Sequence, residues 1–238
     1  MPGKGYRLLL AIDTSTKYAG ILLYQDETEV FSQLWHSSNS HTVELMPAIN
    51  DALDKCKIKG QDILAIALAL GPGGFSSLRV GISAAKGLSL ALKIPLIGIS
   101  TLEAEAFPYA HTGMPICPIL EIGKSNIGWA QFEMRNNIWT KVHEEQIISS
   151  SEIRRYIPNG ALICGEGLTI TQSITEEIIA NKMIKIEPSK PKMRLWALAQ
   201  LGFSRLQDGK TNDMIKLQPL YLREPSITQP NSPSRIKQ

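Results

Sequence analysis

The stretch Gly71-Pro72-Gly73-Gly74-Phe75-Ser76-Ser77 decides how this chain is read, because it ends an apolar run and leads directly into a helical pattern. Residues 63–70 before it have the length and apolarity of a core strand, and residues 78–92 after it have helical composition. Glycine permits positive φ and leaves backbone N–H groups open to a close neighbour. A strand, a glycine turn and a helix N-terminus in this order can hold an anion such as phosphate.

The same turn fails the two commonest phosphate-loop patterns. No Gly-Lys-Ser/Thr follows at P-loop spacing, and Ser76 stands where a dinucleotide fingerprint has its third glycine. An equally simple interpretation is that Gly71, Gly73 and Gly74 only make a tight turn and let helix and strand pack closely. The local sequence leaves both interpretations open.

Composition places the chain among ordinary globular proteins. Its 238 residues are 43% hydrophobic and 20% charged, which suits one large domain or two small ones. The net charge of +3 is too small to indicate a nucleic-acid surface, and no Lys/Arg run with interleaved aromatics occurs. The apolar run 8–12 is stopped by Asp13 and is too short for a signal peptide or a membrane span, so we expect a cytoplasmic protein with no membrane contact.

Cysteine usage agrees with that placement. Cys56, Cys117 and Cys164 are odd in number, far apart and without a Cys-x-x-Cys pair, which disfavours a disulfide framework and a zinc knuckle. We expect three reduced core residues.

The first half of the chain has a mixed α/β pattern. A helix with apolar residues from Leu45 to Cys56 is expected, with Ser40 as its N-cap and with Pro47 bending or interrupting it. The other expected elements are strands at 7–13, 20–24, 30–35, 63–70 and 95–99, and helices at 78–92 and 101–107.

The second half repeats this architecture weakly after a Gly/Pro-rich boundary at 108–115. We expect an N-terminal lobe at 1–107, a C-terminal lobe at 108–222 and a flexible tail at 223–238. The elements expected after the boundary are strands at 116–122, 127–134, 138–142 and 161–164, and helices at 152–156, from the 165–167 turn through 178, and at 192–207.

Several segments, taken in order, resemble a known family. LLAIDTST, HSSNSHTVELMPAI, GPGGFSSLRVGISAAKGLSLAL, IPLIGISTLEA and LQPLYLREP are similar to the TsaB (YeaZ) family, a partner in making N6-threonylcarbamoyladenosine (t6A) on tRNA. The glycine turn with its helix is the most specific of these segments. IDTST alone is weak, because many actin-like and sugar-kinase-like proteins begin similarly.

The resemblance implies a fold and a role. The fold is the actin-like, Hsp70-like (ASKHA) nucleotidyl fold with two related α/β lobes. The role is that of a non-catalytic subunit that binds and activates the catalytic paralogue TsaD, with the ATPase TsaE completing the assembly. The chain would have no cofactor of its own, ADP or ATP could lie at the interface with TsaD, tRNA would be contacted indirectly, and the lone chain could form a homodimer.

The resemblance implies partner-binding residues on two helices, because the family forms its dimer interface there, and the two turns offer candidates for anion binding. Leu45, Met46, Ile49 and Leu53 on the first helix and Leu78 and Ile82 on the second are the partner-binding candidates, unless they pack inside their own lobe. The nucleotide- or anion-binding candidates are Asp13, Thr14, Ser15, Thr16, Gly71, Gly73, Gly74, Ser76 and Arg79. Arg79 lies one turn into the helix, where it suits an anion contact or a solvated salt bridge.

The sequence departs from the family pattern at two places. The usual Gly-Pro-Gly-Ser-Phe-Thr-Gly turn ends here in Ser76-Ser77, which removes the last glycine and one hydroxyl. The Asp-Ala-Arg that often opens the second lobe appears as Glu121-Ile122-Gly123-Lys124, so no role is carried to that strand.

Two catalytic alternatives remain. In a small-molecule kinase or ATPase of the same fold, Asp13 would orient metal-bound phosphates, whereas the simpler role is to cap the turn of Thr14 to Thr16. A metal enzyme would need paired histidines, but His36 and His41 are five residues apart and cannot share a helix face. His111 and His143 stand alone, and no Ser/His/Asp or His/Glu arrangement indicates a peptidase.

Overall fold

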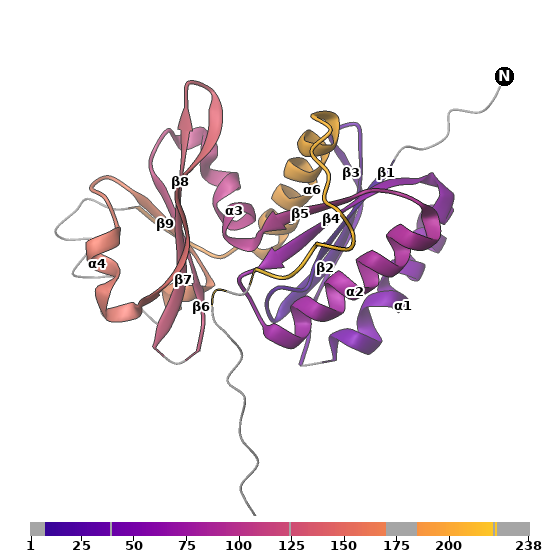
Figure 1. The fold of residues 1–238 in the computed structure, drawn as a ribbon, viewed down its shortest axis with the longest axis horizontal. Helices are drawn as coiled ribbons and strands as arrows, with labels where there is room; N and C mark the ends of the chain where they lie inside the picture. The colour runs from indigo at the N-terminus through magenta and orange to yellow at the C-terminus, as the bar shows by residue number, and fades with distance from the viewer. Residues whose placement is uncertain (1–7, 39, 124, 170–184, 221, 223–238) are drawn as a thin grey trace, which may run out of the picture.

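Two lobes, each built on a five-stranded mixed sheet, stand side by side in the computed structural model (Figure 1). The structure describes residues 8–38, 40–123, 125–169, 185–220 and 222. Of the sequence expectations, the helix through residue 178 and the tail 223–238 lie outside these residues. No helix in the described ranges has the length and apolarity needed to cross a membrane.

The first lobe has a sheet with strand order β3-β2-β1-β4-β5. β1, β2 and β3 form an antiparallel meander, and β4 and β5 add to β1 in parallel. β1 and β4 lie inside the sheet and are apolar up to Asp13 at the end of β1, because helices cover both faces of the sheet. The five strands are β1 (Leu8–Asp13), β2 (Tyr18–Gln25), β3 (Thr28–His36), β4 (Ile63–Gly71) and β5 (Leu96–Ser100).

Helices α1 (His41–Cys56) and α2 (Phe75–Leu92) cover one face of this sheet. α1 is continuous, so the interruption expected at Pro47 does not occur. Ser40 is the N-cap residue, as expected, but its side chain makes no capping bond; its backbone carbonyl accepts from the amides of Val43 and Glu44 instead.

The second lobe repeats the topology of the first. β6, β7 and β8 form an antiparallel meander, β9 adds to β6 in parallel and β10 adds to β9 in parallel, so the repeat expected from sequence is confirmed. β8 is longer than expected and β10 was missed, because both lie at an edge of the sheet where the apolar pattern is weak. The strands are β6 (Ile116–Glu121), β7 (Asn126–Arg135), β8 (Ile138–Ser149), β9 (Leu162–Gly165) and β10 (Lys185–Pro188).

Short helices connect these elements. α4 (Ile153–Tyr156) follows β8, and one turn of 3-10 helix precedes it. The 3-10 turns are η1 (Gly60–Asp62), η2 (Phe107–Thr112), η3 (Ser150–Glu152) and η4 (Glu166–Thr169).

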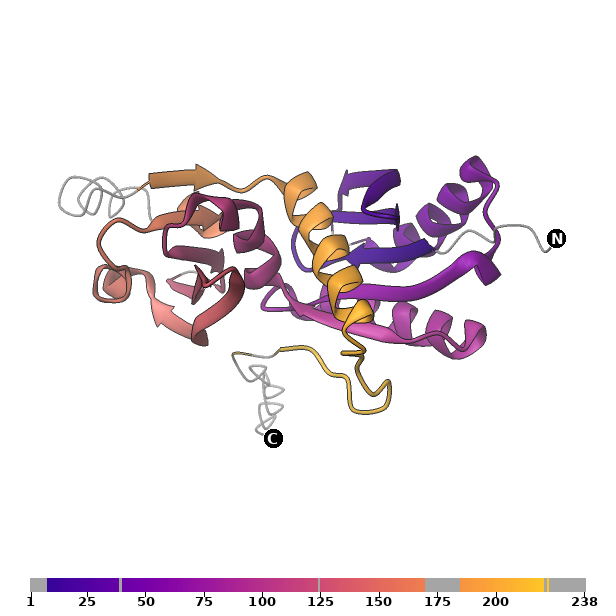
Figure 2. The ribbon, with the colours of Figure 1, turned by 90° about the horizontal axis from the view of Figure 1, so that it is seen from above.

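The last helix of each repeat reaches the other lobe. α3 (Thr101–Ala106) follows β5 and is buried between the two sheets, including its Glu103 and Glu105. α6 (Pro191–Gln207) follows β10 and returns to the open face of the first sheet, as Figure 2 shows. The second lobe therefore does not extend to residue 222 as expected: α6 belongs to the first lobe, because its apolar face packs on β1 and β4.

The segment after α6 closes the edge of the first sheet at β5. The amide of Asn212 donates to Leu96 O, and its side-chain Oδ1 accepts from the amide of Gly98 at 2.7 Å. Leu217 is buried, and the amide of Leu220 donates to Leu70 O. Both contacts hold this segment against the first lobe.

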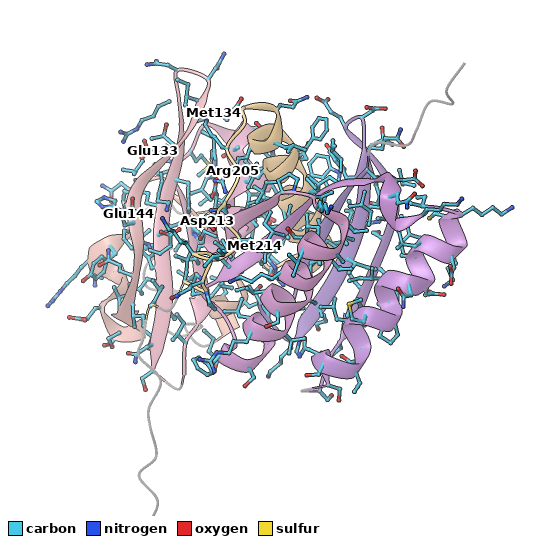
Figure 3. The ribbon with its side chains drawn as sticks, turned by 45° about the vertical axis from the view of Figure 1, so that its right-hand side comes forward. Glu133, Met134, Glu144, Arg205, Asp213 and Met214 are labelled. Atoms are coloured by element: carbon cyan, nitrogen blue, oxygen red, sulfur yellow. The ribbon has the colours of Figure 1, made fainter. Side chains whose placement is uncertain are left out.

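An ion pair in which one guanidinium nitrogen contacts both carboxyl oxygens joins α6 to α3 on the same side. Arg205 Nη2 lies 2.7 Å from both carboxyl oxygens of Glu103, and Nη1 donates to Gly98 O at 3.1 Å. Figure 3 labels Arg205 on α6, and Asp213 and Met214 on the segment that follows it. These contacts fix α6 at its C-terminal end.

We predict that Gly202→Ala weakens the docking of α6. A Cβ at this position would overlap the Cβ of Ala67 on β4, so the helix must move away from the sheet. Overpacking of this kind costs about 1–3 kcal/mol, measurable by urea unfolding. The control is Gly87→Ala on α2, where no atom lies within 4 Å of the new Cβ. That change should stabilise by about 0.5–1 kcal/mol, and equal effects of both changes would contradict the packing argument.

Candidate functional site

A cleft of about 800 Å³ opens between the lobes. The first lobe contributes the β1–β2 turn, the β3–α1 loop and the glycine turn with the start of α2. The second lobe contributes residues at the ends of β6, β9 and β10. Of the predicted anion-binding residues, the cleft brings together Ser15, Thr16, Gly73, Gly74 and Ser76. Four do not line it: Asp13, Thr14, Gly71 and Arg79.

The innermost polar group of this region is Arg194, whose side chain is 1% exposed. Nε donates to Asp13 Oδ2 at 2.8 Å, and Nη1 donates to Glu105 Oε2 at 3.1 Å. Nη1 also donates to Glu166 Oε1, and Nη2 to Thr16 Oγ1, both at 2.9 Å. We call these five residues the Arg194 cluster.

The electrostatics of the Arg194 cluster hold the arginine in its charged form. Burial by itself would lower the pKa of the Arg194 guanidinium. The charges of Asp13, Glu105 and Glu166 outweigh burial and raise that pKa above its ordinary value. The guanidinium is therefore a permanent cation with three carboxylates around it.

Asp13 has both carboxyl oxygens occupied. Oδ1 accepts from the amide of Ser15 at 2.9 Å and from its hydroxyl at 2.6 Å, and Oδ2 accepts from Arg194. The carboxylate thus caps the turn after β1, which was the simpler of the two roles expected for it. A divalent cation with its phosphates would need this carboxylate free, so the residues around Asp13 do not fit a metal–nucleotide group.

The glycine turn packs tightly against the β1–β2 turn. A Cβ on Gly73 would overlap Ser15 O, and one on Gly81 would overlap the hydroxyl of Thr14. The amide of Gly74 donates to Ser15 O at 2.9 Å, and Thr14 Oγ1 donates to Ser77 O at 2.8 Å. The amide of Gly74 is therefore already used, and the interpretation as a close-packing turn accounts for its glycines.

Two residues of the turn contact their own neighbours. Ser77, which replaces the family's last glycine, donates its hydroxyl to Gly74 O at 3.0 Å. The guanidinium carbon of Arg79 lies 3.7 Å from the centroid of the Phe75 ring, which is a cation–π contact. Arg79 itself is not among the residues that line the cleft.

The partner-binding candidates require a correction. Leu45, Ile49, Leu78 and Ile82 are at most 5% exposed, because the apolar stripes of α1 and α2 face their own sheet. Leu53 packs partly against the same core. Only Met46 of the six is exposed. The exposed large apolar residues on the two helices are Val43, Met46 and Leu90.

The histidines lie on different elements, as expected. His36 ends β3, and its ring meets the ring of Tyr18 edge-on. His41 begins α1 and is buried, with Nδ1 3.2 Å from Ser37 Oγ and Nε2 3.3 Å from Thr16 O. Across the described ranges, no three His, Cys, Asp or Glu side chains converge as a metal site would require.

Sequence reasoning missed Arg194 and Glu105, and it considered Glu166 only within the turn Gly165-Glu166-Gly167, as a structural turn or one that faces a nucleotide. A signal was present, because Arg194 interrupts the buried face of the expected helix 192–207, and the segment 102–107 is apolar except for Glu103 and Glu105. Charged residues at core positions are rare unless they are paired. Their partners could not be named, because Asp13 and Arg194 are 181 residues apart in the chain.

The fold and the site define a class of protein. It is a two-lobed actin-like α/β protein in which Asp13, at the end of β1, is paired with the buried Arg194. A model of the TsaD family, described as tRNA N6-adenosine threonylcarbamoyltransferase, matches residues 35–225. The tRNA threonylcarbamoyladenosine biosynthesis protein TsaB of Bacillus subtilis is 27% identical, over 90% of this chain and 93% of that protein. The chain belongs to the TsaD family and, within it, to the TsaB (YeaZ) group.

Two further similarities agree with this assignment. TsaB of Buchnera aphidicola subsp. Schizaphis graminum is 32% identical, over 61% of this chain and 70% of that protein. The structure of YeaZ from Pseudomonas aeruginosa has a TM-score of 0.74 at 22% identity, and the match covers 91% of this chain and all of that one (100%).

We predict that Arg194→Met destabilises the fold by about 3–5 kcal/mol, because the change leaves buried carboxylates without their cation. Urea unfolding followed by circular dichroism measures the loss. The matched control is Lys192→Met in the same helical turn, where the exposed ammonium pairs with Glu29 at 3.4 Å. That change should stay within about 0.5 kcal/mol of the parent protein, and similar values for both variants would contradict the assigned role of Arg194.

Proposed function

We propose that this chain is the non-catalytic subunit of a t6A-forming assembly, in which it binds and activates a TsaD-type threonylcarbamoyltransferase together with TsaE. The observation that carries the proposal is the occupied carboxylate of Asp13 in a member of the TsaB group. Relatives at 27% and 32% identity are named for t6A biosynthesis, and their names describe a biosynthesis protein rather than a transferase.

The alternative, a small-molecule kinase or ATPase, is supported only by the fold. Such an enzyme needs a carboxylate at the end of β1 that is free to hold a cation and its phosphates. In this chain the carboxylate faces Arg194, and the glycine turn donates the amide of Gly74 to Ser15 O. Both contacts favour a structural role for Asp13 and the glycine turn, the two parts that would bind the nucleotide in a kinase.

The proposed partner surface is the outer side of α1 and α2. Val43 is 71% exposed, Leu90 is 67% exposed and Met46 is 37% exposed. These side chains replace the buried candidates as the residues that would meet TsaD, or a second copy of the chain when TsaD is absent. Exposed apolar residues of this size are a common feature of protein–protein contact surfaces.

The remaining parts of the proposal concern ligands and location. We place ADP or ATP at the joint surface with TsaD and not at Asp13, and we place tRNA in contact with the assembly rather than with this chain directly. A net charge of +3 supports the second point, because it provides little attraction for a polyanion. The proposed site of action is the cytoplasm, where tRNA is modified.

We predict that tRNA from cells depleted of this protein loses t6A and regains it when the protein is restored. Mass spectrometry of digested tRNA nucleosides measures the modification. An unchanged t6A level in cells without a second homologue would contradict the proposed function. ATP turnover with small hydroxylated or carboxylated substrates by the lone chain would then support the kinase alternative.

The partner surface has its own prediction. Val43→Glu combined with Met46→Glu should abolish co-purification with TsaD and lower t6A, because two charges would be buried at the contact. The matched control is Ile138→Glu combined with Ile215→Glu, which alters two residues, 67% and 82% exposed, that belong to neither α1 nor α2. Loss of TsaD binding in both variants, or in neither, would contradict the surface assignment.

A further inference from the structure

Three side chains from different parts of the chain meet beside the cleft, which two of them, Thr16 and Glu166, line. Thr16 belongs to the β1–β2 turn of the first lobe, Arg194 to the first turn of α6, and Glu166 follows β9 of the second lobe. Thr16 Oγ1 donates to Glu166 Oε1 at 2.9 Å, and Arg194 reaches both residues, also at 2.9 Å. Each member of the set contacts the other two, and one member comes from the second lobe.

The first lobe and α3 hold the arginine in a fixed orientation. Asp13 accepts from Nε, and Glu105 accepts from Nη1, and both carboxylates are at most 3% exposed. Nη1 also donates to Glu166, and Nη2 donates to Thr16 and, at 3.5 Å, to Tyr18 O. The cation is therefore anchored by two buried carboxylates and contacts Thr16 and Glu166, which line the cleft, from inside the protein.

We propose that Thr16, Glu166 and Arg194 form an inter-lobe latch, which holds the two lobes at one angle without a bound nucleotide. The permanent charge of Arg194 occupies the position beside Asp13 that a cation would need, so the lobes are bridged by the chain itself. The inference uses the fold and these contacts alone and does not depend on the proposed function.

The latch has a permanent side and a side that can open. The side chains of Asp13 and Glu105 are 2% and 3% exposed, whereas that of Glu166 is 26% exposed and can be reached by water. Opening the cleft therefore separates Glu166 from Thr16 and Arg194 while the two inner ion pairs remain intact. The guanidinium keeps two carboxylate partners in the open state, which keeps opening compatible with a folded protein.

The test compares Glu166→Ala with Glu121→Ala by hydrogen exchange and small-angle X-ray scattering of the full chain. Glu121 is exposed, lies on the second lobe and lines the same cleft, so it is a matched control. Glu166→Ala leaves Arg194 paired with Asp13 and Glu105, so the variant should fold. We expect amide exchange at residues 14–18 and 162–168 to become about tenfold faster, with a larger radius of gyration.

The amides of β1 and β4 should exchange as in the parent protein, and Glu121→Ala should exchange as the parent throughout. Glu166→Gln keeps an acceptor oxygen without its charge and should lie between the parent and Glu166→Ala. The latch is overturned if Glu166→Ala matches the parent, or if its exchange rises equally in the sheet core, since that outcome marks general destabilisation.

Discussion

One buried guanidinium is the shared ion-pair partner of three carboxylates between the lobes. Asp13 and Glu105 are almost inaccessible to water, and carboxylates in such a place are strongly unfavourable unless a cation and hydrogen bonds accompany them. Arg194 supplies both, through a fork of donors that matches several acceptors at once. The position of α6, the end of β1 and the burial of α3 all depend on this contact.

The duplicated topology explains why Arg194 lies between the two lobes. Each repeat ends in a helix that leaves its own sheet, and α3 and α6 pack against each other between the lobes. Because α6 returns to the first sheet, its first turn lies close to the end of β1 and to the second lobe at once. The ion pair of Arg205 with Glu103 secures the same helix pair at the other end of α6. The two lobes are therefore joined by exchanged helices as well as by the chain connection.

The glycine turn illustrates how a motif can keep its shape with a different role. A phosphate loop needs backbone amides that are open to the ligand. Here Gly74 gives its amide to Ser15 O, and Gly73 has no Cβ because Ser15 occupies that space. The glycines let two turns of one lobe touch, and the turns then form one wall of the cleft. The neighbouring Arg79 also contacts a residue of its own lobe, because its guanidinium lies over the ring of Phe75.

Apolar periodicity and turn residues are local signals, and they were enough to predict the order of nearly all the elements and the repeat of the two halves. The resemblance of several segments predicted the family, and Ser15, Thr16 and the glycine turn were already grouped as anion-binding candidates. The three-dimensional structure was needed to show which lobe α6 joins, that the apolar stripes of α1 and α2 face inward, and that Asp13 is paired with Arg194. These outcomes depend on contacts between residues far apart in the chain, and the Asp13–Arg194 separation of 181 residues leaves no periodic trace in the sequence.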